Sequence, residues 1–270
     1  MLGVDLSACR VAITQGASGI GLATARLFAE AGASVALSAR DARQLEQAKA
    51  VLSATHPAAR VLTLRGDNTQ AADMRHFALA AASAFGGVDL LVTNAGENRP
   101  SSMTALAPVE WVDQVQQKLA SLVCPIRAFV PQLEKSARGA NAAIVCVNSS
   151  LAYRPQARLA AASAGSACVQ NLVRSLAQEL APKHIRVNAV LIGLQASRSR
   201  QERSQKQNMP AEAKARWEAD WAHTHGVPLG RLGQPDEVAR AILFLGTPLL
   251  AYTTGSHIDV TGGLLDGCAR

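Results

Sequence analysis

The chain has 270 residues, of which 49% are hydrophobic and 17% charged, and its formal net charge is +7. This length is sufficient for one large α/β domain with a buried core, and the hydrophobic fraction excludes a disordered chain. Because Lys and Arg are spread along the chain and aromatic residues make up only 4%, the charge indicates an anionic cofactor or substrate and argues against nucleic acid.

Short apolar runs alternate with longer helical stretches along the chain. Strands are expected at Val11–Thr14, Ser34–Ser38, Arg60–Leu64, Val88–Asn94, Ala142–Ser149, Ile185–Leu191 and Ser256–Val260. Helices are expected at residues 19–31, 41–54, 70–84, 108–135, 160–180 and 235–245. The alternation predicts a parallel sheet with right-handed crossovers, and the almost wholly apolar strands indicate helices on both faces. Because no internal repeat or low-complexity linker occurs, residues 1–270 are predicted to form a single doubly wound α/β domain.

A glycine-rich turn, TQGASGIG at residues 14–21, follows the first strand and opens the first helix. Glycines let the backbone come close to a pyrophosphate, and the free N–H groups of the helix start attract its charge. A glycine cluster alone is a weak signal, but its place between a strand and a helix strengthens it. The residues expected to hold a dinucleotide here are Gln15, Gly16, Ser18, Gly19, Ile20 and Gly21.

The ends of the next three strands carry further candidates for a dinucleotide site. Arg40 follows the second strand, where the adenosine ribose would lie, and an arginine there suits a 2′-phosphate. This favours NADP(H) over NAD(H), unless Arg40 only faces water. Asp67 follows the third strand and either accepts a hydrogen bond from the adenine amino group, next to Asn68, or is an ordinary turn aspartate. The Asn94-Ala95-Gly96 run ends the fourth strand, where small residues let a cofactor lie against the backbone.

Residues 195–227 interrupt the alternation with a polar, charged stretch between the sixth strand and the last helix. A long insertion at this point is typical of a lid or substrate-binding segment. The alternative is a solvated helical excursion with mixed charges, and both descriptions can hold together.

With these features the chain resembles the short-chain dehydrogenase/reductase family over nearly its whole length. The matching segments are residues 14–21, Asp67, residues 93–96, Ser149-Ser150, residues 176–182, 185–188, 228–231 and Thr254-Gly255. The resemblance implies a Rossmann-type three-layer sandwich with seven parallel strands, a nicotinamide cofactor, interconversion of alcohols and ketones, and a homotetramer or homodimer. It also adds Gly193 to the cofactor site. Two departures stand out: the family's first glycine falls on Gln15, and its proline before Gly193 falls on Ile192.

The family's proton-transfer residues are largely missing from this chain. Counted back from residues 175–182, the family's tyrosine falls on Ala162 and its lysine, four residues later, on Ser166. The family's serine falls on Ser149, thirteen residues before Ala162, and Pro155 supports the same register. Counted from Trp111, the family's helix asparagine falls on Lys118. Loss of a general acid typically slows a reaction by roughly 10²–10⁴-fold.

Three residues are therefore candidates for the altered chemistry. Ser149 polarises a carbonyl, or it is a strand-end serine bonded to backbone. Lys118 extends its ammonium into the space left by Ala162 and Ser166, where it restores the positive charge beside the cofactor ribose or donates the proton directly, or it faces water or a neighbouring subunit. Tyr153 is a substitute donor. Ser166 is kept as a cofactor contact.

These candidates leave several functions open. The first is an NAD(P)(H)-dependent oxidoreductase with an atypical active centre, acting on a small molecule, in particular an anionic one. The alternative is a dinucleotide-binding pseudoenzyme that serves as a sensor or inactive partner subunit, and a third is an interaction protein without nucleotide. Five scattered cysteines without CxxC spacing suit a reducing compartment. We expect a cytoplasmic protein without a metal site, a secretory signal or a membrane span.

Overall fold

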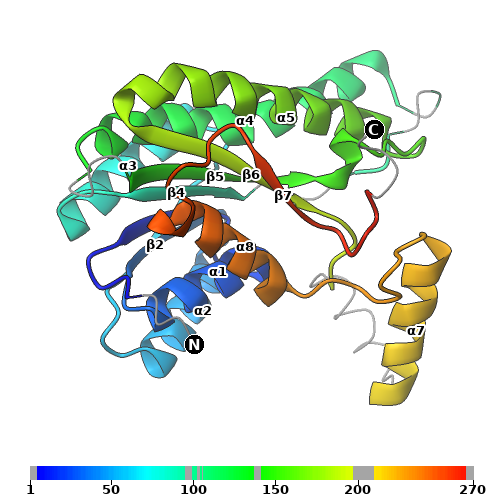
Figure 1. The fold of residues 1–270 in the computed structure, drawn as a ribbon, viewed down its shortest axis with the longest axis horizontal. Coiled ribbons are helices and arrows are strands. Elements are labelled where there is room, and N and C mark those ends of the chain that lie inside the picture. The colour runs from blue at the N-terminus through cyan, green and yellow to red at the C-terminus, as the bar shows by residue number, and fades with distance from the viewer. Residues whose placement is uncertain are drawn as a thin grey trace.

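The computed structural model describes residues 5–94, 99–101, 104, 106–136, 141–196 and 210–265, which form a seven-stranded sheet between two helix layers (Figure 1). The strands are β1 (Arg10–Thr14), β2 (Ser34–Ala39), β3 (Val61–Arg65), β4 (Leu90–Asn94), β5 (Ala142–Ser149), β6 (Ile185–Ile192) and β7 (His257–Val260). The helices are α1 (Gly19–Glu30), α2 (Ala42–Thr55), α3 (Ala71–Phe85), α4 (Pro108–Leu133), α5 (Ala160–Leu180), α7 (Ala211–Thr224) and α8 (Pro235–Gly246). Short 3₁₀ turns are η2 (Ser150–Ala152), η3 (Ala181–Lys183) and η4 (Pro248–Leu250).

The doubly wound α/β fold predicted from the sequence is confirmed. Every strand pair is parallel, in the order β3-β2-β1-β4-β5-β6-β7. All predicted strands and helices recur in the structure with small shifts at their ends. The shift at β4, predicted from Val88 and observed from Leu90, is among the largest.

The strand order places the functional edge of the sheet. The chain first runs outward from β1 to β2 and β3, then returns to the other side of β1 to form β4. The carboxyl ends of β1 and β4 therefore diverge into different connections. In open α/β sheets this switch point is where ligands bind.

The strands contribute side chains to two apolar cores, one on each face of the sheet. In β5, Val145 and Val147 pack with Phe28 in the layer of α1, α2 and α8. The alternate residues Ile144 and Cys146 pack in the layer of α3, α4 and α5. Successive side chains of a strand point to opposite faces, so a sheet covered on both sides has apolar residues at every position.

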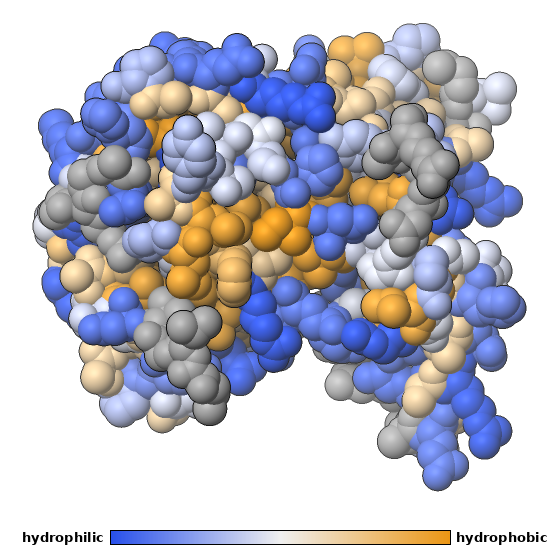
Figure 2. Space-filling view, viewed as in Figure 1, coloured by the Kyte–Doolittle hydropathy of each residue, from blue (hydrophilic) through white to orange (hydrophobic). Residues whose placement is uncertain are grey.

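Helix α7 stands apart from the layered body and lies within the polar insertion (Figure 1). Its Ala222 is fully buried in a small third cluster with Ala196, Val227 and Leu264. The rest of the visible α7 surface is mostly hydrophilic (Figure 2). Residues 197–209 of the predicted lid lie outside the described residues, and the lid itself stays a prediction.

Of the helices in the described ranges, none is both long and apolar enough to cross a bilayer.

Candidate functional site

The turn between β1 and α1 is shaped by its three glycines. A Cβ on Gly16 would lie 2.6 Å from Leu37 Cδ2, and one on Gly21 would lie 2.3 Å from the carbonyl oxygen of Gln15. Gly19 has a φ of +53° and no atom within 4 Å of its Cβ position. Gly16 and Gly21 let the turn fold tightly, and Gly19 leaves an open surface at the helix N-terminus. That combination forms a cradle for a phosphate group.

The other residues of the turn fit the same use. Gln15 has a φ of +49°, in the left-handed region that favours glycine. Ser18 is the N-cap of α1, yet its hydroxyl makes no capping hydrogen bond. Ile20 packs against the core. The Ser18 hydroxyl and the first N–H groups of α1 are thus positioned to receive an anion.

A hydrogen-bond network joins the ends of β1 and β4. The Asn94 N–H donates to Thr14 Oγ1 at 3.0 Å, and its Nδ2 donates to the Gln15 carbonyl at 3.4 Å. Asn68 Nδ2 donates to the Asn94 carbonyl at 3.4 Å. The predicted site residues Gln15, Asn68 and Asn94 are thus brought together at the switch point. The Ala95-Gly96 pair lies outside the described residues.

Arg40 lies at the exposed edge that follows β2. Its carbonyl accepts a hydrogen bond from Arg65 Nε at 3.1 Å. The adjacent carboxylate, Asp41, caps α2 by accepting from the N–H groups of Arg43 at 2.9 Å and Gln44 at 3.2 Å. Among the described residues no carboxylate pairs with the Arg40 guanidinium. This edge therefore offers a positive charge to a ligand.

Asp67 organises the turn after β3. Its Oδ1 accepts from both the N–H and the hydroxyl of Thr69, at 2.9 and 2.8 Å, and its own N–H donates to Asp73 Oδ2 at 2.8 Å. These are the bonds of a turn aspartate, and they occupy one carboxylate oxygen. The contact of Asp67 with an adenine amino group stays a prediction.

Ser149 is the last residue of β5 and is 8% exposed. Its Oγ accepts a hydrogen bond from the Leu151 N–H at 3.2 Å and caps η2. A hydroxyl that accepts one bond still has its own proton to donate. Ser149 can therefore cap η2 and donate to a carbonyl oxygen at the same time.

Tyr153 is engaged on another side of α5. Its hydroxyl accepts from Arg174 Nη2 at 3.4 Å, and its ring lies 5.3 Å from that of His257. The nitrogens His257 Nδ1 and Gln170 Nε2 are 3.3 Å apart. Burial lowers the pKa of His257, and the charge of Arg174 adds to this. The structure thus groups Tyr153 with Arg174 and His257, not with the predicted site residues Ser149 and Lys118.

Lys118 of α4 packs against Gly165 of α5, the residue before Ser166. Its Cβ and Cγ lie 3.2 Å from the position of a Cβ on Gly165. The residue as a whole is half-buried, and desolvation lowers the pKa of its ammonium to about 8. The ammonium has no hydrogen-bond or carboxylate partner in the described part of the chain. Ser166 is fully buried, and its Oγ also has no partner there.

The direction of Lys118 follows from the topology. Helices α4 and α5 each connect two parallel strands, so both begin at the carboxyl edge of the sheet. Helical side chains lean toward their own N-terminus. By this rule we expect the side chain of Lys118 to lean from Gly165 toward the edge where β5 ends at Ser149. Ala162, one turn before Ser166, presents only a methyl group there.

Asn148 is a buried polar residue that sequence reasoning missed. Its Nδ2 donates to the Ser166 carbonyl at 3.0 Å, and its Oδ1 has no partner in the described ranges. The available signal was an amide at the end of an otherwise apolar strand, immediately before Ser149. It fastens the end of β5 to α5.

Gly193, the remaining predicted cofactor residue, follows β6. A Cβ on it would lie 3.0 Å from both Cα and Cβ of Thr261. The glycine is required there because the segment after β7 passes close to its backbone. Thr261 is 4% exposed, and its Oγ1 has no hydrogen-bond partner within the described residues.

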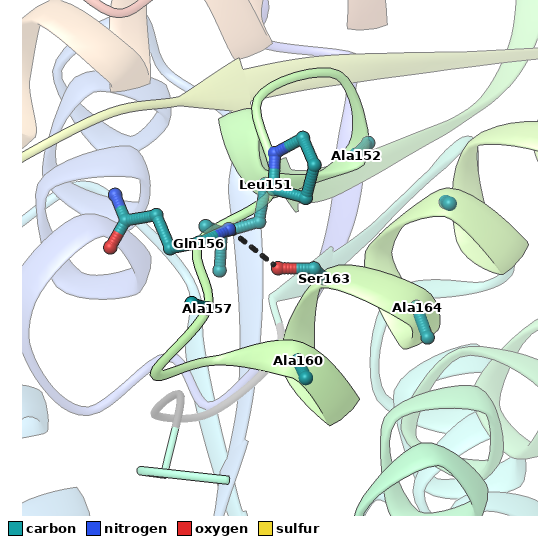
Figure 3. A pocket seen from close by; sticks show the side chains of 9 residues that line it. Leu151, Ala152, Gln156, Ala157, Ala160, Ser163 and Ala164 are labelled. Carbon is teal, nitrogen blue, oxygen red and sulfur yellow. Dashed lines mark hydrogen bonds between the residues drawn. The ribbon is translucent and has the colours of Figure 1, made fainter. Parts of the chain in front are cut away.

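A hollow of about 470 Å³ lies beside η2 and the first turns of α5 (Figure 3). It is lined by Leu151, Ala152, Pro155, Gln156, Ala157, Ala160, Ser163, Ala164 and Ala167. The Gln156 N–H donates to Ser163 Oγ at 3.3 Å across it. At 3.6 residues per turn, Ala164 and Ala167 lie about 100° and about 160° around α5 from Gly165. The residues that line this hollow carry no charged side chain.

Comparisons with known proteins agree with this geometry. The family model described as enoyl-(acyl carrier protein) reductase matches residues 16–265. An uncharacterized short-chain type dehydrogenase/reductase of Sinorhizobium fredii is 32% identical over 261 residues, covering 95% of this chain and 97% of the relative. The NADPH-bound structure of a short chain oxidoreductase from Pseudomonas aeruginosa, described as containing an atypical catalytic center, has a TM-score of 0.89 and 48% identity, covering 96% of this chain and 98% of that chain. L-sorbose reductase from Gluconobacter frateurii, complexed with NADPH and L-sorbose, has a TM-score of 0.87 and 28% identity, covering 98% and 99%.

Proposed function

Because the chain belongs to the short-chain dehydrogenase/reductase family, we propose that it is an NADP(H)-preferring oxidoreductase with an atypical active centre, in which Ser149 and Lys118 handle the proton. Its reaction interconverts an alcohol and a carbonyl group on a small molecule. The observation that carries this proposal is the stem of Lys118, which packs against Gly165 of α5 and leaves its ammonium without a partner among the described residues.

The residues at the switch point fit a nicotinamide dinucleotide. Gly16, Ser18 and Gly19 would hold the pyrophosphate at the start of α1. Arg40 would pair with a 2′-phosphate, since Asp41 is already engaged as a helix cap. Asn94 and its network would support the cofactor against the backbone. When bound, the cofactor supplies or receives the hydride.

The chain's own residues would then move the proton. Ala162 and Ser166 occupy the positions where the family carries tyrosine and lysine, and Ala162 has no proton to give. The Lys118 ammonium would donate its proton to the oxygen that gains negative charge, and its pKa of about 8 is close to the pH at which such donors work best. The Ser149 hydroxyl would donate a hydrogen bond to the same oxygen.

The insertion at residues 195–227 would cover the substrate. Support comes from the cluster that anchors α7, because Ala196 in that cluster follows the carboxyl end of β6. The basic residues of the insertion suit an anionic substrate. We further infer that the protein is a homotetramer or homodimer, as the resemblance implies.

Two measurements test the function. The first is titration with NADPH and NADH, read by melting temperature, which rises when a ligand binds the folded state. The second is turnover on a panel of ketones and aldehydes, including anionic ones. Lys118→Met and Ser149→Ala are each expected to lower kcat by roughly 10²–10⁴-fold with little change in cofactor affinity. Lys49→Met, on the exposed face of α2, is the matched control.

The outcomes separate the alternatives. Binding of NADPH without product on any substrate would favour the pseudoenzyme. Full turnover by Lys118→Met would remove Lys118 from the mechanism. Failure of both dinucleotides to raise the melting temperature would contradict the cofactor site itself.

A further inference from the structure

Gly165 is an unusual residue for its place in the chain. It lies in the interior of α5, where a glycine weakens the helix relative to alanine. The neighbouring residues Ala160, Ala161, Ala162 and Ala164 are all strong helix formers. A glycine kept among alanines therefore calls for a packing reason.

The packing reason is the stem of Lys118. A Cβ on Gly165 would meet Lys118 Cβ and Cγ at 3.2 Å each, which is tighter than an ordinary carbon–carbon contact. The next nearest atom, Val115 Cα, would be at 3.8 Å, an ordinary contact distance. The backbones of α4 and α5 would thus tolerate an alanine at 165, and only the lysine side chain opposes it.

We propose that Gly165 is a positioning residue for Lys118: the missing Cβ makes the slot in α5 along which the lysine stem lies, so that its ammonium reaches the carboxyl edge beside Ala162. This inference rests on the proposed function for the role of Lys118, and it deepens that function by naming the residue that holds the proton donor in place. A Cβ at 165 would displace the stem by a few tenths of an ångström and turn the ammonium toward water.

The test is a comparison of two substitutions in the same helix. Gly165→Ala adds the Cβ that meets Lys118, whereas Ala164→Gly alters helix propensity at a residue that faces the hollow. The readout is the NMR titration of the Lys118 side chain, assigned by its absence in Lys118→Met. The wild-type midpoint is expected at about 8. Gly165→Ala should raise it toward 10.5, the value of a solvated lysine, and Ala164→Gly should leave it unchanged.

An unchanged midpoint in folded Gly165→Ala would overturn the proposal. With an active substrate, the pH at which the reduction rate falls should move upward in the same variant, together with a lower kcat. If no carbonyl compound is turned over while the midpoints behave as expected, the proposed function fails and the positioning role stands.

A double substitution keeps the test open if Gly165→Ala does not fold. Lys118→Ala removes Cγ and with it one of the two close contacts. The double variant Lys118→Ala with Gly165→Ala is then expected to fold and to melt at a temperature close to that of Lys118→Ala alone. A double variant that also fails to fold would overturn the proposal.

Discussion

One hydroxyl, that of Thr14, holds Asn94 from two sides. Thr14 Oγ1 accepts from the Asn94 N–H at 3.0 Å and donates to the Asn94 carbonyl at 3.3 Å. The paired residues of β1 and β4 end at Ile13 and Val92, so the hydroxyl continues the connection between the strands beyond the ladder. Both Thr14 and Asn94 are buried. This bond pair therefore fixes the ends of β1 and β4, where the dinucleotide is proposed to bind.

Thr14→Val should destabilise the protein and weaken dinucleotide binding. Valine keeps the shape but removes the acceptor of the buried Asn94 N–H and leaves the Asn94 carbonyl with Asn68 Nδ2 alone, which costs about 1–3 kcal/mol. Thr24→Val is the control, because Thr24 Oγ1 bonds only to the Ile20 carbonyl within α1, at 2.8 Å. Urea denaturation and NADPH titration of both variants check this. Equal losses in the two would mean that the Thr14 bond has no special role.

Arg40→Glu should reverse the cofactor preference. Loss of a charge-assisted hydrogen bond and addition of a like charge should weaken NADPH binding by roughly 10–100-fold and leave NADH little affected. Arg26→Glu changes the net charge equally from an exposed position on α1. Dissociation constants for both dinucleotides give the answer. A parallel loss of NADPH and NADH affinity in Arg40→Glu would argue against a 2′-phosphate contact.

The sequence was sufficient for the fold because local and global signals agree. Strands such as β5 are apolar at almost every position, and the glycine turn marks the first crossover. Helix α7 was not placed, because its alternating charges give no apolar stripe and only its end near Ala222 is buried. Its stability depends on a small cluster of residues distant in sequence, which no local pattern shows.

The site was predicted less completely than the fold. Spacing identified Ser149 and Lys118, but not that the stem of Lys118 lies against Gly165. That contact joins two helices and depends on their separation. The bond from Asn148 to Ser166 was missed for the same reason. Conversely, Tyr153 was a candidate by its distance from Ser149 along the chain, whereas the structure turns its hydroxyl to Arg174.

Lys118 should lower the stability of the protein at neutral pH. The pKa of Lys118 is about 8 in the folded protein and 10.5 for a solvated lysine, so between these values the unfolded chain binds more protons. Stability therefore rises with pH from about 8 to 10.5. Lys118→Met removes this dependence and should add about 1–3 kcal/mol to the free energy of unfolding at pH 7, and little near pH 10. Lys49→Met should change neither value. Urea denaturation at pH 7 and near pH 10 is the measurement. If Lys118→Met changed the free energy of unfolding equally at both pH values, the lowered pKa of Lys118 would be contradicted.

Arg186 should be among the most important residues for stability although it lies far from the reacting centre. It is buried on β6, and its guanidinium donates to the carbonyls of Leu245 at 2.8 Å and Thr247 at 3.2 Å, and to two more after η4 begins. These carbonyls lie at the C-terminal end of α8, where the helix dipole favours a positive charge. Burial lowers the pKa of Arg186, yet an arginine stays charged. Arg186→Met removes a charged donor from all four carbonyls, of which three keep a second donor, from the N–H groups of Leu250 and Thr253 and from Asn188 Nδ2. We expect the free energy of unfolding to fall by about 1–3 kcal/mol. Arg186→Lys should lose less, because it keeps the charge with fewer donors. Arg174→Met, at an exposed position of α5, is the control. A urea midpoint for Arg186→Met close to that of Arg174→Met would show that the carbonyls find other partners.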